Sequence, residues 1–259
     1  MKISEITGAI NEFAPLSLQE SWDNSGVQVG CVATECSGAL LCVDVKPEII
    51  REAIEKKCNL IISHHPLIFK GLKHICPDES QVQESVYLAI SNGITVFSSH
   101  TALDSASEGI SRRMALMLGA KPLQPLVPAE DPATGLGCVG ELDSAMTTDE
   151  FVRHVKKVFK ADAVRCSRAS TSIKRIALCG GSGGEFIPMA IAAGCDAYVT
   201  ADVRYHDFVD HGHAIFIADI GHFESEECSK EIFYRIISEK FHNFAVYKSE
   251  TEKNPIKYI

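Results

Sequence analysis

Two adjacent histidines, His64 and His65, follow directly on the apolar run NLIIS and precede Pro66. A single histidine in such a position is more often a hydrogen-bonded structural residue than a ligand. Side chains on a regular strand alternate between its faces, so neighbouring rings would point apart. Because the strand can end here and Pro66 biases His65 toward an extended backbone, both rings can turn to one side. The pair is therefore a candidate for metal binding.

Further polar side chains follow two other candidate strands. The run ITVFSS is followed by His100 and Asp104, and the run AIFIAD by His222 and Glu226. In open parallel sheets the loops at the carboxyl ends of the strands converge on the ligand. His222 and Glu226 are four residues apart where a helix is expected to begin, so their side chains can share one face. These residues are expected to meet the paired histidines.

Imidazole and carboxylate together are typical ligands of zinc, manganese, iron or nickel, whereas magnesium and calcium sites consist mostly of oxygen. A catalytic zinc normally has three protein ligands, and this set is larger. The sequence therefore predicts two divalent metal ions per chain, and a water shared between them would give hydroxide near neutral pH. The predicted metal ligands are His64, His65, Asp104, His222 and Glu226.

Catalytic roles are assigned to Glu226, His206 and His100. Glu226 and Asp104 are expected to hold the metals. His100 and His206 are expected to move protons or to orient the ligands, and direct ligation is an equal alternative for both. The other histidines occur in surface-like contexts and are expected to be solvated; they are His74, His154, His211, His213 and His242.

A glycine-rich stretch, GGSGGE, follows the apolar run RIALC. Where such a stretch opens a helix, its backbone N–H groups can bind a phosphate, so Gly180, Gly181, Ser182 and Gly183 are candidate cofactor-binding residues. The stretch matches neither G-x-G-x-x-G nor the phosphate-loop motif. A tight turn that requires positive φ explains it nearly as well. Ser182 has no evident base partner, which argues against a serine nucleophile.

Composition narrows the class of protein. The chain has 259 residues, is 46% hydrophobic and carries a formal net charge of −9, which argues against a dedicated nucleic-acid surface. No segment is apolar for long enough to span a bilayer, and MKISEITGAINEF does not have the pattern of a signal peptide. The ten cysteines include no C-x-x-C pair and are expected to be reduced. We therefore expect a cytoplasmic protein without a membrane partner.

Apolar β-branched runs alternate with amphipathic segments, which predicts an α/β protein with mainly parallel or mixed sheets. Four prolines at 122–132 suggest a linker between two lobes, with the metal site in the cleft between them. The predicted lobes are 1–125 and 126–242, and the terminal segment 243–259 is free to complete the first lobe. Thr147 and Glu150 have the spacing of a capping box, and Ile3, Ile6, Ile10 and Phe13 that of an apolar helix face.

Six stretches of the chain match one known pattern: WDNSGVQVG (22–30), IISHHPLIF (61–69), SSHTALD (98–104), CGGSGGEFI (179–187), AYVTADVRYHD (197–207) and DIGHFESE (219–226). Together they resemble one protein family, the GTP cyclohydrolase 1 type 2 homologues, also called Ngg1-interacting-factor-three-like proteins. The resemblance implies a two-metal site between two α/β lobes, on the same five ligands, and a toroidal homohexamer. It also implies hydrolytic opening of the imidazole ring of GTP with release of formate, and the length implies the short form without an inserted domain.

The leading interpretation is therefore a metal-dependent hydrolase in which metal-bound hydroxide attacks a nucleotide-like small molecule. A phosphoesterase acting with the same metals, and a non-catalytic metal-binding regulatory or adaptor protein, remain alternatives. In one place the chain departs from the family: Thr200, Ala201 and Asp202 stand where relatives usually have Thr-Gly-Glu or Thr-Gly-Asp. Alanine disfavours positive φ, so the shape of this loop is expected to differ.

Overall fold

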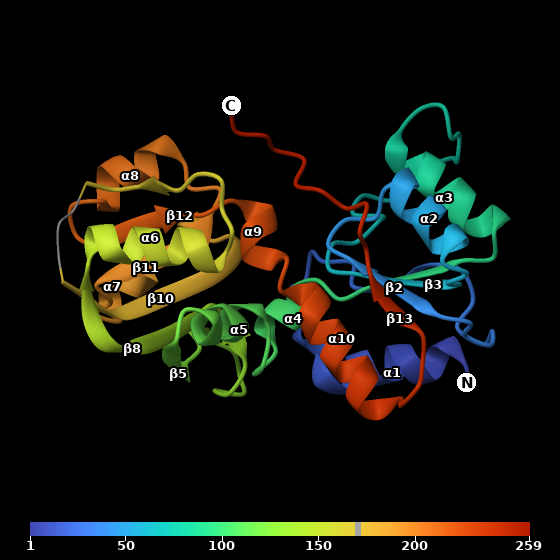
Figure 1. The fold of residues 1–259 in the computed structure, drawn as a ribbon, viewed down its shortest axis with the longest axis horizontal. Coiled ribbons are helices and arrows are strands. Elements are labelled where there is room, and N and C mark those ends of the chain that lie inside the picture. Colours follow the sequence, from blue (N-terminus) through green and yellow to red (C-terminus); the bar gives the residue numbers. More distant parts are fainter. Residues whose placement is uncertain (169–171) are drawn as a thin grey trace. The chain divides into compact units, whose positions relative to one another are not determined.

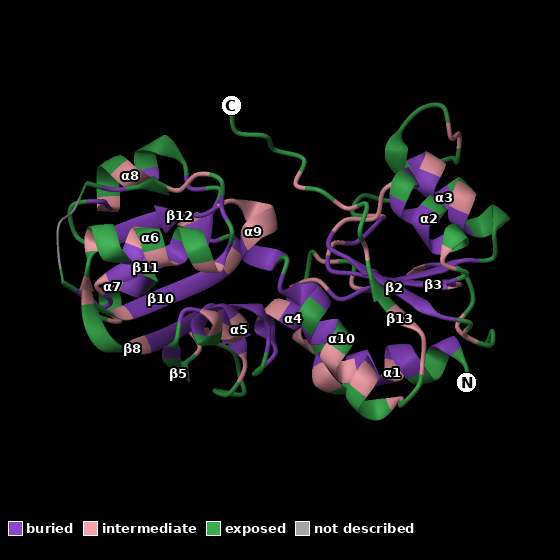
Figure 2. Ribbon diagram, in the orientation of Figure 1, coloured by how far each residue is buried: buried purple, intermediate pink, exposed green. Residues whose placement is uncertain are grey.

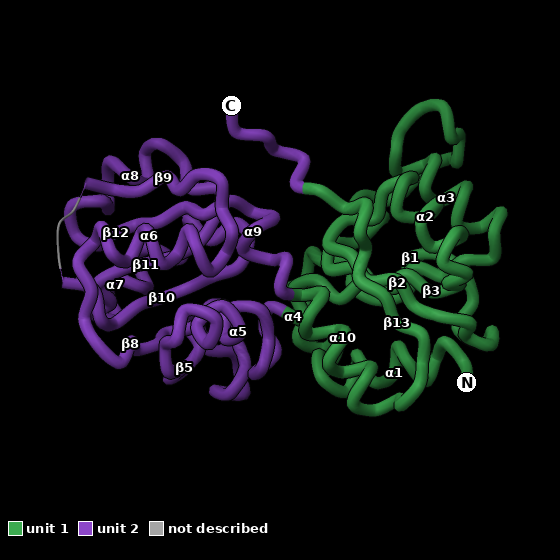
Figure 3. Tube along the Cα trace, viewed as in Figure 1, with its two compact units in different colours: residues 1–103, 229–253 green, residues 104–228, 254–259 purple. Residues whose placement is uncertain are grey.

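A computed structural model describes residues 1–168 and 172–259. The chain forms two compact units, each built from two stretches of sequence (Figure 3). Unit 1 comprises residues 1–103 and 229–253, and unit 2 comprises residues 104–228 and 254–259. Each unit has its own sheet, which agrees with the predicted α/β class.

The sheet of unit 1 is mixed and has the order β1-β4-β3-β2-β13. Neighbouring strands are parallel except at β1, which runs antiparallel to β4. Every residue of β2, β3 and β4 is buried (Figure 2), as expected for strands that helices cover on both faces. The strands are β1 (Gly26–Val29), β2 (Ala39–Cys42), β3 (Leu60–Ser63), β4 (Thr95–Ser98) and β13 (Val246–Lys248).

Helices cover both faces of this sheet (Figure 1). Helices α2 and α3 pack together on one face, and α1 and α10 pack together on the other, where α10 also contacts β2 and β13. Ile3, Ile6 and Ile10 are fully buried, which confirms the predicted apolar face of α1. The helices are α1 (Ile3–Phe13), η1 (Leu16–Leu18), α2 (Pro47–Glu55), α3 (Gln81–Ser91), α4 (Thr101–Ser105, at the boundary with unit 2) and α10 (Ser229–Lys240).

The sheet of unit 2 has the order β5-β8-β10-β11-β12-β9. Only β10, β11 and β12 run parallel to one another, and the other pairings are antiparallel. A separate two-stranded sheet joins β6 to β7. The strands are β5 (Ala120–Gln124), β6 (Val127–Pro128), β7 (Gly135–Leu136), β8 (Cys138–Thr147), β9 (Arg165–Cys166), β10 (Ser172–Ser182), β11 (Ala197–Ala201) and β12 (Phe216–Asp219).

Helices α5 and α6 both contact β8 and β10 and lie on either side of them (Figure 1). The capping box of α6 is present as predicted: the Thr147 hydroxyl accepts from the N–H of Glu150, and the Glu150 carboxylate accepts from the N–H of Thr147. The helices of unit 2 are α5 (Ile110–Met117), α6 (Thr148–Val158), η2 (Gly184–Phe186), α7 (Ile187–Ala192), α8 (Tyr205–His211) and α9 (His222–Glu226).

The boundaries of the two units differ from the predicted lobes. The proline-rich segment is not a linker, because β5 pairs with β8 through Pro122 and Gly140, and α5 packs on the same sheet. Helix α10 belongs to unit 1 because its apolar side packs on α1 and β2. Strand β13 completes the sheet of unit 1 by parallel pairing with β2, as the prediction allowed. The apolar faces that each segment buries, and not its sequence position, determine its unit.

All ten cysteines lie in the described part of the chain and are free thiols, as predicted. Over residues 1–168 and 172–259, no helix is both long enough and apolar enough to cross a membrane.

Candidate metal centre

The rings of His64 and His65 lie next to each other at the end of β3. The pairing with β2 continues for two residues beyond the strand, since the N–H groups of His64 and His65 donate to the carbonyls of Cys42 and Val43. The His65 carbonyl then accepts from the Ser63 hydroxyl at 2.8 Å. The two ring centroids are 5.0 Å apart. The rings therefore turn to one side, as predicted for a strand that ends before Pro66.

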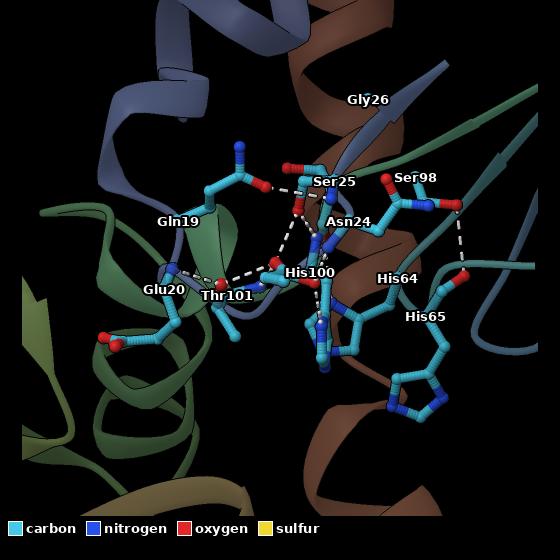
Figure 4. Close-up of polar contacts among 12 residues, drawn as sticks. Gln19, Glu20, Asn24, Ser25, Gly26, His64, His65, Ser98, His100 and Thr101 are labelled. Carbon is cyan, nitrogen blue, oxygen red and sulfur yellow. Dashed lines mark hydrogen bonds and ion pairs between the residues drawn. The ribbon is translucent and has the colours of Figure 1, made fainter. Parts of the chain in front are cut away.

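His100, at the end of β4, adds a third ring (Figure 4). Its centroid is 5.3 Å from that of His64 and 5.5 Å from that of His65. One nitrogen from each ring lies within 4.8 Å of the others, which is a spacing that a metal ion can bridge. His64 is fully buried, and the other two rings are partly exposed. Unit 1 thus brings together the two predicted ligands and the predicted proton carrier.

Each of these three rings has its Nδ1 atom held by an oxygen that can only accept a hydrogen bond. The proton must therefore be on Nδ1, and in the neutral ring Nε2 carries the lone pair. Histidines that ligate metals commonly have this arrangement, because the outer partner fixes the tautomer and the orientation of the ring. The pairs are His64 with the Ser99 carbonyl at 3.0 Å, His65 with Asp44 Oδ1 at 2.8 Å, and His100 with Asp23 Oδ1 at 2.8 Å.

Asp23 is a buried carboxylate with several donors. Its Oδ2 accepts from the Thr101 hydroxyl at 2.6 Å and from the Ser25 hydroxyl at 2.8 Å. Burial opposes ionisation, but the hydrogen bonds from His100, Thr101 and Ser25 outweigh it and hold the pKa of Asp23 well below its usual range. Asp23 therefore remains an acceptor and keeps the His100 ring in one orientation.

Asp44 is positioned by a buried ion pair from the C-terminal part of unit 1. The carboxylate of Glu252 accepts from the backbone N–H groups of Val43 and Asp44, both at 2.8 Å. Its other oxygen lies 3.0 Å from Lys230 Nζ, and both charged side chains are almost completely buried. The orientation of His65 thus depends on residues about two hundred positions away in the sequence.

In unit 2, His222 and Glu226 lie on one face of α9, as their spacing predicted. His222 Nδ1 is 2.7 Å from Asp202 Oδ2, and His222 Nε2 is 3.0 Å from Glu226 Oε2. With the Nδ1 proton directed at Asp202, a neutral ring would place a lone pair against a carboxylate. This contact therefore requires a proton shared between the two groups or a metal ion bound by both. This donor set fits the predicted metal.

Glycine is required at position 181 because the backbone passes directly beside these two ligands. A Cβ atom there would lie 2.2 Å from Glu226 Oε1 and 3.3 Å from His222 Nε2, and the backbone has φ +63°. The N–H groups of Gly180 and Gly181 donate to the hydroxyls of Ser111 and Ser225. Phosphate binding by this stretch stays a prediction, and two of its four amide groups already have acceptors.

Asp104 and Glu226 lie around the same two thiols in unit 2. Burial raises the pKa of Cys179 and of Cys228 to about 12, and the negative charges of Asp104 and Glu226 contribute to the rise at both. Asp104 also lines a cavity of about 320 Å³ with Arg112 and the proline-rich segment. Both carboxylates are thus near enough to influence the same two thiols, and Asp104 also has open space beside it.

The departure at Ala201 has a local explanation. Ala201 is buried at the end of β11, and the residue with positive φ is Asp202, at +53°. A left-handed backbone is unfavourable for a residue other than glycine and is found where neighbouring contacts impose it. Asp202 makes such a contact, because its carboxylate binds His222. Alanine at 201 therefore does not distort the loop.

The structure does not group His206 with the other candidates. His206 is exposed on α8, with its ring 5.4 Å from that of Tyr205. Among the histidines expected to be solvated, His74 is exposed and contacts Glu79, whereas His154 is hydrogen-bonded to the Leu118 carbonyl. Sequence reasoning missed Asp23, Asp44 and Asp202. Asp44 follows β2 directly, so the strand-end rule that found the histidines identifies it as well.

The two sheets and these His and Asp/Glu sets define a class of protein: a two-unit α/β protein with candidate metal ligands at the ends of its strands. The model of the family described as DUF34/NIF3 (NGG1p interacting factor 3) matches residues 1–255. The chain therefore belongs to the DUF34/NIF3 family, as its motifs predicted.

Relatives in several bacteria match the whole chain. A Clostridium acetobutylicum protein called "GTP cyclohydrolase 1 type 2 homolog" is 33% identical over 266 residues, which cover 100% of this chain and 99% of the relative. A Campylobacter jejuni protein with the same name is 33% identical over 262 residues, covering both chains completely. Length and coverage agree with the predicted short form.

Solved structures show the same fold. A hypothetical protein of Staphylococcus aureus superposes with a TM-score of 0.93 at 29% identity, over 100% of this chain and 99% of that chain. A Bacillus cereus protein related to NIF3 superposes with a TM-score of 0.90 at 22% identity, over 100% and 99% of the two chains. At that lower identity the likeness shows the fold alone.

Proposed function

We propose that the protein is a metal-dependent hydrolase with two divalent ions per chain. The observation that supports this most directly is the tautomer of four histidines: His64, His65, His100 and His222 each have Nδ1 directed at an oxygen acceptor. Buried or structural histidines do not need a common orientation of this kind, whereas metal ligands do.

The proposed metal ligands are His64 and His65 in unit 1 and Asp104, His222 and Glu226 in unit 2. Neutral imidazoles and carboxylates suit zinc, manganese, iron or nickel. When bound, such ions activate water near neutral pH and stabilise a developing oxyanion. The two carboxylates would offset part of the positive charge of such ions, and the fully buried His64 ring would present its Nε2 atom to them.

His100 is proposed to hold and move the proton of the attacking water. Its Nδ1 proton is fixed by Asp23, so Nε2 is the atom that can take up a proton. The buried Asp23 carboxylate stabilises the imidazolium that forms, because the two groups are in hydrogen-bond contact at 2.8 Å. His206 lies exposed on α8, and its contact with Tyr205 adds no support for the catalytic role that the sequence suggested.

The substrate is proposed to be a small nucleotide-like molecule. Support comes from the name of the curated relatives, "GTP cyclohydrolase 1 type 2 homolog", and from the cavity of about 320 Å³ beside Asp104, where Arg112 forms an ion pair with Glu108 at 2.8 Å. A homo-oligomer of the hexameric kind and a cytoplasmic location are further proposals. Light scattering on the purified protein tests the oligomeric state. The ten free thiols agree with the proposed cytoplasmic location.

The test is to load the purified protein with zinc, manganese, iron or nickel in turn and to incubate it with GTP. Release of formate, lost in His65→Ala and retained in His74→Ala, is the expected result. Hydrolysis of a generic phosphodiester without formate release would instead favour a phosphoesterase. Metal binding with neither activity would contradict the hydrolase and leave a metal-binding regulatory protein.

A further inference from the structure

Two large aromatic side chains of unit 1 lie exposed beside the histidine cluster. Trp22 is 59% exposed and Phe69 is 53% exposed. Their ring centroids are 5.9 Å apart, and the His100 ring is 5.9 Å from Trp22 and 6.2 Å from Phe69. All three rings meet at steep angles, 55° to 75°, so that faces as well as edges remain accessible. We call Trp22 and Phe69 the aromatic pair.

The aromatic pair is held in place by the backbone around it. The Asn24 side chain donates to the carbonyl of Ile68 at 2.7 Å, and the Gln28 side chain accepts from the N–H of Ile68 at 3.1 Å. Gln28 also donates to the carbonyl of Asn24 at 2.6 Å. These bonds tie the segment before Phe69 to the loop after Trp22. The two rings are therefore preorganised although they are exposed, which lowers the entropy lost on binding.

We propose that the aromatic pair is the stacking platform for a planar heteroaromatic ring of a small-molecule ligand. A ring placed on Trp22 or Phe69 would gain dispersion and quadrupole contacts that are specific to flat π-systems. Its edge would reach His100, and the nitrogen or oxygen atoms there can accept or donate hydrogen bonds. An aliphatic side chain of a protein partner would cover the imidazole without such bonds, which costs free energy.

This inference rests on the proposed function, since it places the ring of the substrate against the proposed proton carrier. It goes further by naming the feature of the substrate that is recognised. It does not depend on metal, because neither Trp22 nor Phe69 is among the proposed ligands. The two proposals can therefore fail separately.

Trp22 is the only tryptophan of the chain, so its fluorescence reports on the platform alone. Guanosine, adenosine and uridine would be titrated into the full-length protein, with inorganic triphosphate as a probe that has no ring. Saturable quenching by at least one nucleoside, and none by triphosphate, is expected. Failure of all three nucleosides would overturn the proposal. So would emission that depends on protein concentration and not on nucleoside, because a second copy would then cover the pair.

Calorimetry on three variants identifies the residues involved. Trp22→Leu and Phe69→Leu are expected to weaken nucleoside binding roughly 5- to 100-fold, the range for loss of one base–aromatic stack. Tyr87→Leu is the matched control, because Tyr87 is 51% exposed in the same unit. This variant should bind the nucleoside with the affinity of the wild type. Unchanged affinity in both platform variants would refute the inference.

The same titration on His65→Ala separates the inference from the proposed function. Retained nucleoside binding with no hydrolysis in the metal-loaded wild type would support the platform and contradict the hydrolase. The opposite result is formate release by the wild type together with unchanged nucleoside affinity and unchanged KM in Trp22→Leu and Phe69→Leu. It would support the hydrolase and contradict the stacking platform.

Discussion

The two units present their candidate ligands in different ways. Unit 1 offers three imidazoles, and each ring is oriented from outside by an oxygen of another segment. Unit 2 offers two carboxylates and one imidazole, and there the backbone itself approaches the ligands, at Gly181. The orientation of the candidate ligands in unit 1 thus depends on hydrogen bonds from other segments. In unit 2 their position depends on the lack of a side chain at Gly181. Substitutions of comparable size should therefore act differently in the two units.

The largest effect is expected when unit 2 loses the charge of its buried ligand. Glu226→Gln keeps the size of the side chain but removes the carboxylate, and the amide can no longer balance a cation beside His222. Affinity for divalent metal should fall by more than about 100-fold. This exceeds the loss that usually follows when a residue that only hydrogen-bonds to a ligand is replaced. Glu227→Gln, at the exposed neighbouring position, is the control and should bind as the wild type does. Equal affinities of the two variants would remove Glu226 from the ligand set.

The backbone approach in unit 2 is tested by Gly181→Ala. The added methyl group would lie 2.2 Å from Glu226 Oε1, so the carboxylate must move and metal affinity should fall by about 10- to 100-fold. The control is Gly194→Ala, because Gly194 has a similar φ of +68° and no atom within 4 Å of the added Cβ. Both variants should lose about 1 kcal/mol of folding free energy from the left-handed backbone.

Chemical denaturation and metal titration together measure these two quantities. If Gly194→Ala lost metal affinity to the same extent as Gly181→Ala, the effect would come from the backbone alone, and the close approach would have no role.

The variants Asp23→Asn and Asp44→Asn test whether these carboxylates orient the rings of His100 and His65 in unit 1. Each amide can present its N–H₂ group to Nδ1, which favours the wrong tautomer of His100 or His65. A loss of about 10- to 100-fold in metal affinity or activity is expected. Nuclear magnetic resonance of the imidazole nitrogens measures the tautomer directly. Rings that keep the proton on Nδ1 in these variants would show that the carboxylates do not set the tautomer.

The smallest effect on the candidate metal site is expected from changes that affect the C-terminal segment, which carries Glu252. The buried carboxylate of Glu52 accepts from the N–H of Glu250 and from the hydroxyls of Ser249 and Thr251. Burial opposes ionisation of Glu52, but these bonds outweigh it, so its pKa is lowered. The stabilisation is therefore present above the pKa of an unfolded glutamate and is lost as pH falls through the lower folded pKa.

Glu52→Gln should remove about 1–3 kcal/mol at neutral pH and flatten the dependence of stability on pH in the acid range. Urea unfolding at several pH values measures both. If the stability of Glu52→Gln fell in acid as steeply as that of the wild type, groups other than Glu52 would cause the acid sensitivity.

The candidate ligands could be predicted from the sequence because each one lies just after a strand or on a short helix that follows a strand. His64 and His65 follow β3, and His222 and Glu226 are one helical turn apart on α9. Among their outer partners, Asp44 also follows a strand, but nothing in the local sequence links Asp23 to His100. Asp23 and His100 are 77 residues apart, and only the pairing of β1 with β4 brings their loops together.

The boundaries of the units were also beyond local reasoning. The four prolines near 122–132 have the composition of a linker, yet the antiparallel pairing of Pro122 with Gly140 makes this segment an edge of the second sheet. Helix α10 could be recognised as a helix, but its return to unit 1 depends on the apolar surface of α1. Composition predicts the type of an element and not the surface on which it packs.

The central claim, that the oriented histidines and the two carboxylates hold metal, is tested most directly by counting the metal. Full-length protein is equilibrated with each divalent ion, freed of excess and analysed by mass spectrometry for metal per chain. The account predicts about two ions in the wild type and a clear loss in His65→Ala, with the fold retained. Far less than one ion per chain under every condition would contradict it.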